Sequence, residues 1–199
     1  MLQLGDGRTF VVGVAVLSDT GATKVGVELS EEQVARLAEE STITDLMDRA
    51  LDALARSRRT RRELELRLLK REATPAQVRT ALDRLEASGV LSDDTVARAE
   101  AGARLRRGDA PARVRQQLRR KGVDQRTVTE AVSEALEEAS ADGFDEVAAC
   151  RAVAEKRARS LRAVAPDVAE RRLLGFLLRR GYAGGLARRI AREVLQARP

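Results

Sequence analysis

The sequence contains no histidine, and this absence excludes several kinds of active site. Without an imidazole there is no Ser–His nucleophile pair, no histidine general base and no histidine metal ligand. The one cysteine, Cys150, can form neither an internal disulfide nor a thiolate metal cage, and its apolar surroundings in the sequence predict a buried thiol. No run approaches the roughly 18 apolar residues of a membrane-spanning helix, so we expect a soluble cytoplasmic protein.

The other residues that could suggest chemistry have simpler structural roles. Thr60 and Ser92 are typical of helix caps, because no base accompanies either hydroxyl. The segment "GYAGG" at 181–185 lacks the preceding strand and the Lys-Ser/Thr of a nucleotide-binding loop. Four acidic residues match the first turns of helices, where carboxylates are favoured: Asp93, Asp94, Asp145 and Glu146. We therefore expect no enzymatic activity, no metal and no cofactor.

Aromatic residues are also scarce: Phe10, Phe144, Phe176 and Tyr182 make up the whole set. Folds that bind single-stranded nucleic acid by base stacking need several exposed rings. Any contact with nucleic acid should therefore be mainly electrostatic, tolerant of sequence and strongly dependent on salt.

What the sequence does contain is arginine, with 33 Arg against 4 Lys and a formal net charge of +6. The charge is unevenly distributed, since residues 1–49 carry a net −5 and residues 50–199 a net +11. A basic balance of this kind favours a phosphate backbone or an acidic protein surface as the partner.

The first 40 residues differ in pattern from the rest. The runs "TFVVGVAVL" at 9–17 and "TKVGVEL" at 23–29 predict the two strands of a β-hairpin, joined by a turn at Asp19–Gly21. Ser30 and Gln33 then form a capping box, which predicts a short helix as far as about Glu40.

From Thr42 onward the pattern is helical, with about nine helices after the hairpin. Capping boxes at Thr60–Glu63 and Thr74–Gln77 begin two of them, and prolines suit the first turns of others. Three glycines are placed to end helices in the left-handed conformation: Gly89, Gly122 and Gly181.

One basic hexamer recurs along the chain, as "LLKREA" at 68–73, "LRRKGV" at 118–123 and "LLRRGY" at 177–182. Four residues before each first leucine stands another apolar residue, which gives an i,i+4 pair on one helical face. The copies are 50 and 59 residues apart, enough for three helices each. The hexamer therefore marks the end of the second helix in each of three tandem units.

This repeat predicts a mainly α-helical protein in which three tandem three-helix units, similar to helix-turn-helix elements, form an elongated curved rod. A small N-terminal β-hairpin precedes them. We place the hairpin and its short helix at 1–41, and the repeats at 42–91, 92–143 and 144–199.

Basic residues collect on the second helix of every unit. A cation in the last turn of a helix is stabilised by roughly 0.3–1 kcal/mol through the helix dipole, so each arginine by itself has a structural explanation. A row of such patches also suits a long, regular, charged partner. The candidate binding surface in the second and third units comprises Arg104, Arg106, Arg107, Arg113, Arg115, Arg119, Arg120, Lys121, Arg171, Arg172, Arg179 and Arg180.

The segment "LEASGVLSDDTVARAEAGARLRRGDAPARVRQQLRRKGV" at 85–123 resembles the RecX regulatory proteins. It has that family's order of Leu-x-x-x-Gly, Asp-Asp with a small residue three positions on, Gly-x-x-Pro and Leu-x-x-Lys-Gly. The upstream "ALDALARSRRTRRELELRLLKR" and the downstream "LLGFLLRRGY" fit the first and third units, so the resemblance covers about 42–197.

The resemblance implies a modulator of the RecA recombinase that binds in the groove of the RecA–DNA filament. Such a protein usually suppresses RecA's ATPase, strand-exchange and co-protease activities, in DNA repair and the SOS response. Its expected partners are the RecA filament, single-stranded DNA and, secondarily, duplex DNA, with the chain acting as a monomer. The alternative is a helix-turn-helix transcription regulator, which would read duplex DNA from one recognition helix, usually as a dimer.

Overall fold

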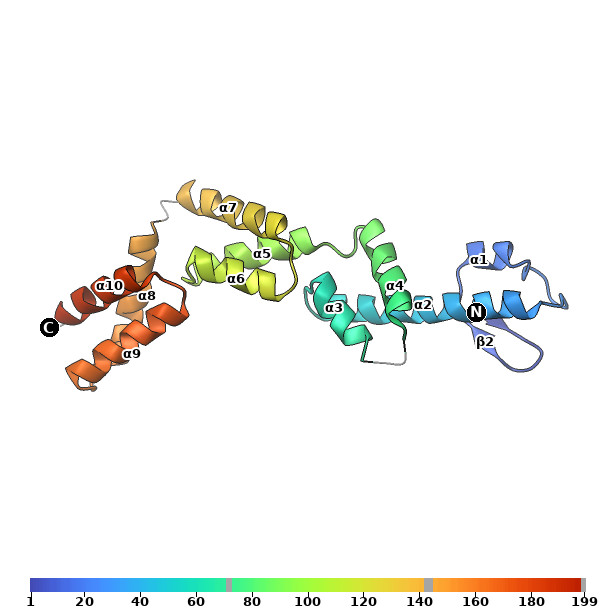
Figure 1. Ribbon diagram of the computed structural model, residues 1–199, viewed down its shortest axis with the longest axis horizontal. Helices are drawn as coiled ribbons and strands as arrows, with labels where there is room; N and C mark the ends of the chain where they lie inside the picture. The colour runs from blue at the N-terminus through green and yellow to red at the C-terminus, as the bar shows by residue number, and fades with distance from the viewer. Residues whose placement is uncertain (71–72, 142–144, 198–199) are drawn as a thin grey trace. The chain divides into compact units, whose positions relative to one another are not determined.

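The computed structural model describes residues 1–70, 73–141 and 145–197 (Figure 1). Arg71, Glu72, Gly143 and Phe144, which the sequence analysis used, lie outside these ranges. The described residues form ten helices and one two-stranded sheet, in two compact units, Met1–Ser92 and Asp93–Pro199. Within the same ranges every helix is either too short or too polar to span a lipid bilayer.

The N-terminal hairpin is present, but its strands are not the predicted ones. β1 (Leu2–Gln3) pairs antiparallel with β2 (Thr9–Phe10), and the predicted strand over 9–17 turns instead into the short helix α1 (Val14–Asp19). The prediction placed the turn at the wrong Asp–Gly sequence. The chain reverses at 4–8, where Gly7 has a φ of +89° and the Leu4 N–H donates to the Arg8 carbonyl at 2.8 Å.

The helix that follows is also longer than predicted. α2 (Glu31–Arg56) starts at the expected capping box of Ser30 and Gln33, but it continues well past Glu40. No glycine or proline interrupts these residues, so nothing in the local sequence ends the helix. Its N-terminal half buries Leu37 against Phe10 and Ala22 of the hairpin segment, and its C-terminal half joins the core of the first repeat.

The first repeat is completed by α3 (Arg61–Leu68) and α4 (Pro75–Ala87). Both predicted capping boxes are present, at Thr60–Glu63 and Thr74–Gln77. The core of this repeat consists of apolar residues from all three helices, with Leu64, Leu82 and Leu85 almost completely buried.

The second unit holds the other two repeats. One consists of α5 (Asp93–Arg106), α6 (Pro111–Arg120) and α7 (Gln125–Ala141), and the next of α8 (Glu146–Arg159), α9 (Pro166–Arg179) and α10 (Gly184–Gln196). Each has its own apolar core. The three tandem three-helix repeats predicted from the hexamer are therefore confirmed.

The hexamer has the same structural role in all three repeats. Its first leucine and the apolar residue four positions earlier are both buried: Leu64 with Leu68, Val114 with Leu118, and Leu173 with Leu177. Gly89, Gly122 and Gly181 all have positive φ, as predicted from their positions after helices. Cys150 lies in the core of the third repeat, and burial raises the pKa of its thiol to about 11, which keeps it protonated.

Candidate nucleic-acid interface

The second and third repeats meet where the α5–α6 turn contacts the α9–α10 turn. The Ala110 N–H donates to the Arg180 carbonyl at 2.9 Å, and the Tyr182 hydroxyl donates to the Gly108 carbonyl at 3.0 Å. Ala110 itself packs into the core of the third repeat. Burial raises the pKa of Tyr182 to about 12, so the hydroxyl remains a donor. These contacts make the second unit one continuous body rather than two adjacent repeats.

Four of the predicted binding residues are engaged by two half-buried carboxylates, Asp109 at this joint and Glu100 on the neighbouring α5. Asp109 has Arg104 at 3.4 Å, Arg113 at 3.7 Å and Arg180 at 3.6 Å. Glu100 contacts Arg104 and Lys121, each at 2.7 Å. These four cations are half-buried and already paired, so a partner's anion would have to compete with these carboxylates for them. Arg107 is exposed, but its carbonyl accepts a hydrogen bond from Arg180.

Glu100 makes the stability of the second unit dependent on pH. Burial alone would raise its pKa, but hydrogen bonds from Lys121 and Arg104 outweigh burial and hold the pKa below its ordinary value of 4.5. The stabilisation is therefore complete above pH 4.5 and is lost as the pH falls through the lower folded-state pKa.

We expect Glu100→Gln to destabilise the second unit by about 1.5–3 kcal/mol at neutral pH, because two half-buried cations each lose a charged hydrogen-bond partner. The variant should also lose part of the acid dependence. Urea unfolding followed by tyrosine fluorescence reports on this unit, since Tyr182 is the only tyrosine and there is no tryptophan. The control Glu130→Gln breaks an exposed pair with Arg126 and should change stability by less than about 1 kcal/mol. Equal losses for the two variants would contradict the role given to Glu100.

Of the remaining candidates of the second repeat, Arg106, Arg119 and Arg120 are exposed and Arg115 is half-buried. Arg119 donates to the Gln125 amide oxygen at 3.2 Å. Within the described part of the chain, Arg106, Arg115 and Arg120 have no carboxylate within ion-pair distance, so they are available to an anion.

The third repeat gathers arginines around an open pocket of about 630 Å³. Arg171, Arg172 and Arg179 line it from one face of α9, together with Val168, and Arg157 lines it from the last turn of α8. Arg171 has Asp167 at 3.3 Å, but both side chains are about three-quarters exposed, so this pair is weak. Among the described residues, Arg172 and Arg179 have no acidic partner. We call Arg157, Arg171, Arg172 and Arg179 the repeat 3 arginine cluster.

The structure thus brings together three predicted residues and adds Arg157, which the sequence analysis missed. In the third repeat that analysis considered only the second helix, whereas Arg157 belongs to the first helix, α8. Its signal was present in the sequence, as a third cation in the last turn of α8 beside Lys156 and Arg159. Arg157 also lies over the Phe176 ring of α9, with its guanidinium carbon 5.7 Å from the ring centroid, and this contact positions it at the pocket.

Comparison with known proteins points to one family. Residues 145–190, which contain the repeat 3 arginine cluster, match the family model described as RecX, third three-helix domain. The chain is 38% identical over 151 residues to the Regulatory protein RecX of Thermobifida fusca, covering 74% of this chain and 77% of that protein. It is 36% identical over 145 residues to the protein of the same name from Halorhodospira halophila, covering 72% and 84% respectively.

Two solved structures have a similar fold. The one titled crystal structure of regulatory protein RecX aligns with a TM-score of 0.71 at 22% identity, over 94% of this chain and 90% of that chain. The structure of RecX from Lactobacillus salivarius aligns with a TM-score of 0.58 at 19% identity, over 77% and 96%. At these identities the likeness shows the fold alone.

Proposed function

The chain belongs to the RecX family of regulatory proteins, and we propose that it binds the groove of RecA–DNA filaments and restrains RecA in DNA repair and the SOS response. The observation that carries the proposal is the repeat 3 arginine cluster, which lies within the segment matched by the family model. Guanidinium groups bind phosphate through two parallel hydrogen bonds, so a cluster without strong acidic partners suits a nucleic-acid backbone.

The proposed role is regulatory and non-enzymatic, and it requires no cofactor. The chain would act in the cytoplasm as a monomer, with repeats at 42–91, 92–143 and 144–199 contacting successive parts of the filament. It would suppress ATP hydrolysis, strand exchange and co-protease activity. The three cluster arginines of α9 lie in its middle and at its C-terminal end. A recognition helix instead reads bases from its N-terminal residues, where this helix carries Pro166 and Asp167.

The test is ATP hydrolysis by the cognate RecA on single-stranded DNA, with this protein titrated at two salt concentrations. We expect inhibition at less than one copy per RecA, weaker at the higher salt because phosphate contacts release counterions. No inhibition at saturating protein would contradict the proposal. Selection from random duplexes tests the alternative in parallel, since an enriched motif would favour a transcription regulator.

A further inference from the structure

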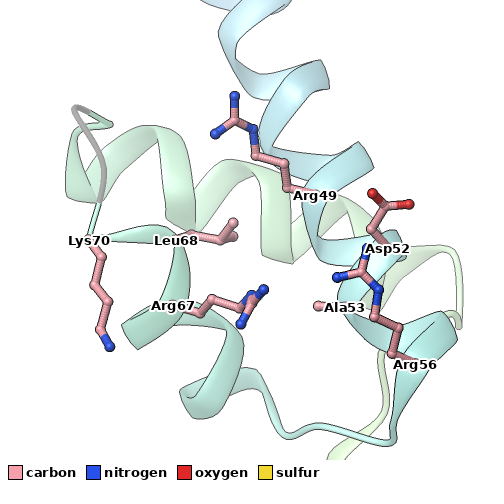
Figure 2. A pocket seen from close by; sticks show the side chains of 7 residues that line it. All are labelled: Arg49, Asp52, Ala53, Arg56, Arg67, Leu68 and Lys70. Carbon is pink, nitrogen blue, oxygen red and sulfur yellow. The ribbon is translucent and has the colours of Figure 1, made fainter.

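A second basic pocket lies in the first unit, where none of the twelve candidate residues is found. It has a volume of about 300 Å³ and lies between the C-terminal half of α2 and the C-terminal end of α3 (Figure 2). Ala53 and Leu68, both almost completely buried, form its apolar floor. Its charged lining consists of four cations and one carboxylate: Arg49, Arg56, Arg67, Lys70 and Asp52.

The pocket differs from the rest of its own helices in how its cations are paired. On α3, Arg61 contacts Asp83 at 2.6 Å and also Glu86, and Arg62 contacts Glu65 at 3.2 Å. In contrast, Arg56, Arg67 and Lys70 have no carboxylate within ion-pair distance in the described part of the chain. In Figure 2, Arg56 and Arg67 extend from the two opposite walls toward the space between them.

Helix dipoles alone do not account for this concentration of charge. The C-terminal ends of α2 and α3 each supply the equivalent of about half a negative charge. Asp52 adds one more, and Arg49 is already paired with Asp45 at 2.7 Å. Three unpaired cations exceed these negative charges, so the empty pocket has an excess of positive charge that a bound anion would neutralise.

An exposed cation occupies the same hexamer position in all three repeats. Lys70 stands two residues after the first leucine of its hexamer, as Arg120 and Arg179 do in theirs, and all three side chains are exposed. In the third repeat, too, the pocket is lined by the end of a first helix and by the second helix that follows. Arg157 lies in the last turn of its first helix, as Arg56 does, and Arg179 has the hexamer position of Lys70. Two repeats therefore build a basic pocket from the same pair of elements.

We propose that the pocket of the first repeat binds a phosphate group of a nucleic-acid backbone, held by Arg56, Arg67 and Lys70. A phosphate has several oxygens that can accept donors from opposite walls, whereas a carboxylate is satisfied by one arginine fork. The inference rests on the proposed function, since it gives the first repeat its own contact with DNA. It concerns binding by the protein alone, so its test requires no RecA.

The first experiment is a titration of the full-length protein with pyrophosphate, followed by ¹⁵N–¹H NMR at the amides of Ala53 and Leu68. The wild type should show saturable shifts. In the variant Arg56→Gln, Arg67→Gln, Lys70→Gln, affinity should fall by about tenfold or more, because hydrogen bonds between charged groups are lost. A control with the same charge change, Arg58→Gln, Arg62→Gln, Arg79→Gln, should bind as the wild type does. Equal behaviour of the two variants would overturn the proposal.

A second variant is expected to bind pyrophosphate more tightly, a result that loss of the folded structure could not produce. Asp52→Asn removes the carboxylate that lines the pocket and should tighten pyrophosphate binding by about threefold to tenfold. Unchanged or weaker binding at these amides would overturn the proposal.

The last arm distinguishes nucleic acid from an acidic protein as the source of the anion. Single-stranded oligonucleotide should cause the same shifts as pyrophosphate, and poly-glutamate at equal charge concentration should not. The slope of log affinity for DNA against log salt should fall by about 0.7 in the pocket variant, as expected for one lost phosphate contact, and remain unchanged in the control. Shifts with poly-glutamate and none with DNA would overturn the assignment to phosphate. Because no step uses RecA, failure here leaves the filament proposal standing, and failure to inhibit RecA leaves this site standing.

Discussion

Replacing the four residues of the repeat 3 arginine cluster with glutamine is expected to weaken binding to single-stranded DNA by more than about tenfold and to reduce inhibition of RecA accordingly. Glutamine retains much of the length and the helix propensity of arginine, so α8 and α9 should remain folded. Of these side chains, Arg171 alone makes an ion pair among the described residues, and that pair is exposed. The substitutions also remove the contact of Arg157 with the Phe176 ring, which contributes only about 0.5–1 kcal/mol at an exposed site.

Salt dependence separates direct contact from a general change in charge. If each of the four arginines meets one phosphate, the slope of log affinity against log salt should fall by about 3. The matched control replaces four exposed arginines elsewhere in the same unit, Arg126, Arg162, Arg188 and Arg189, and should shift the slope much less. Unchanged ATPase inhibition by the cluster variant would contradict the assignment of this surface.

Three arginines of α6 in the second repeat should contribute to DNA binding independently of the repeat 3 arginine cluster. The variant that tests this contribution is Arg115→Gln, Arg119→Gln, Arg120→Gln. It leaves the adjacent Lys121 unchanged, because that residue also has a structural role. Lys121 contacts Glu100 of α5, so its removal would disturb the packing of α6 on α5 as well as the surface.

Gly181→Ala is expected to be the most destabilising single change, at roughly 2–5 kcal/mol for the second unit. Gly181 has a φ of +87°, which a residue with a side chain adopts at a cost of about 1–2 kcal/mol. An added methyl group would also lie 2.5 Å from the Arg113 Cβ and 3.1 Å from its backbone nitrogen. Relief of that overlap requires α6 to move away from the α9–α10 turn, which breaks the joint.

Two other glycine variants separate the backbone cost of a positive φ from the steric overlap with Arg113. Gly89 has a φ of +74° with nothing within 4 Å of an added Cβ, so Gly89→Ala should show only the backbone cost, in the first unit. Gly184, at the start of α10, has ordinary φ and open surroundings, so Gly184→Ala should be neutral or slightly stabilising. Urea unfolding by circular dichroism and by Tyr182 fluorescence measures these effects. A Gly181→Ala loss no larger than that of Gly89→Ala would contradict the steric argument.

The joint also connects stability to the binding surface. Arg180 shares the α9–α10 turn with Gly181 and contacts Asp109 of the α5–α6 turn, while the preceding residue, Arg179, points into the arginine pocket. Adjacent residues of one hexamer therefore have different roles, one in the fold and one in the proposed interface. A variant that opens the joint is expected to weaken DNA binding even though every cluster arginine is present.

The sequence by itself determined the features that depend on local interactions. The capping boxes, the prolines in first turns, the glycines with positive φ and the buried leucine pair of each hexamer all follow from residues within one or two helical turns. Their order along the chain was enough to predict three repeats of three helices and to support the family resemblance. These features can be predicted because a helix cap or an i,i+4 apolar pair forms through the same local interactions in any protein.

Only the tertiary structure decided the features that depend on distant residues. It paired Thr9–Phe10 with Leu2–Gln3, and it packed the two halves of α2 into two different apolar cores. It also gave neighbouring arginines different roles. Arg180 forms an ion pair with Asp109, which is 71 residues away in the sequence, whereas Arg179 has no carboxylate within ion-pair distance among the described residues. Whether a guanidinium stabilises the fold or remains available to a phosphate depends on which carboxylates the packing brings within about 4 Å, and sequence spacing does not specify that distance.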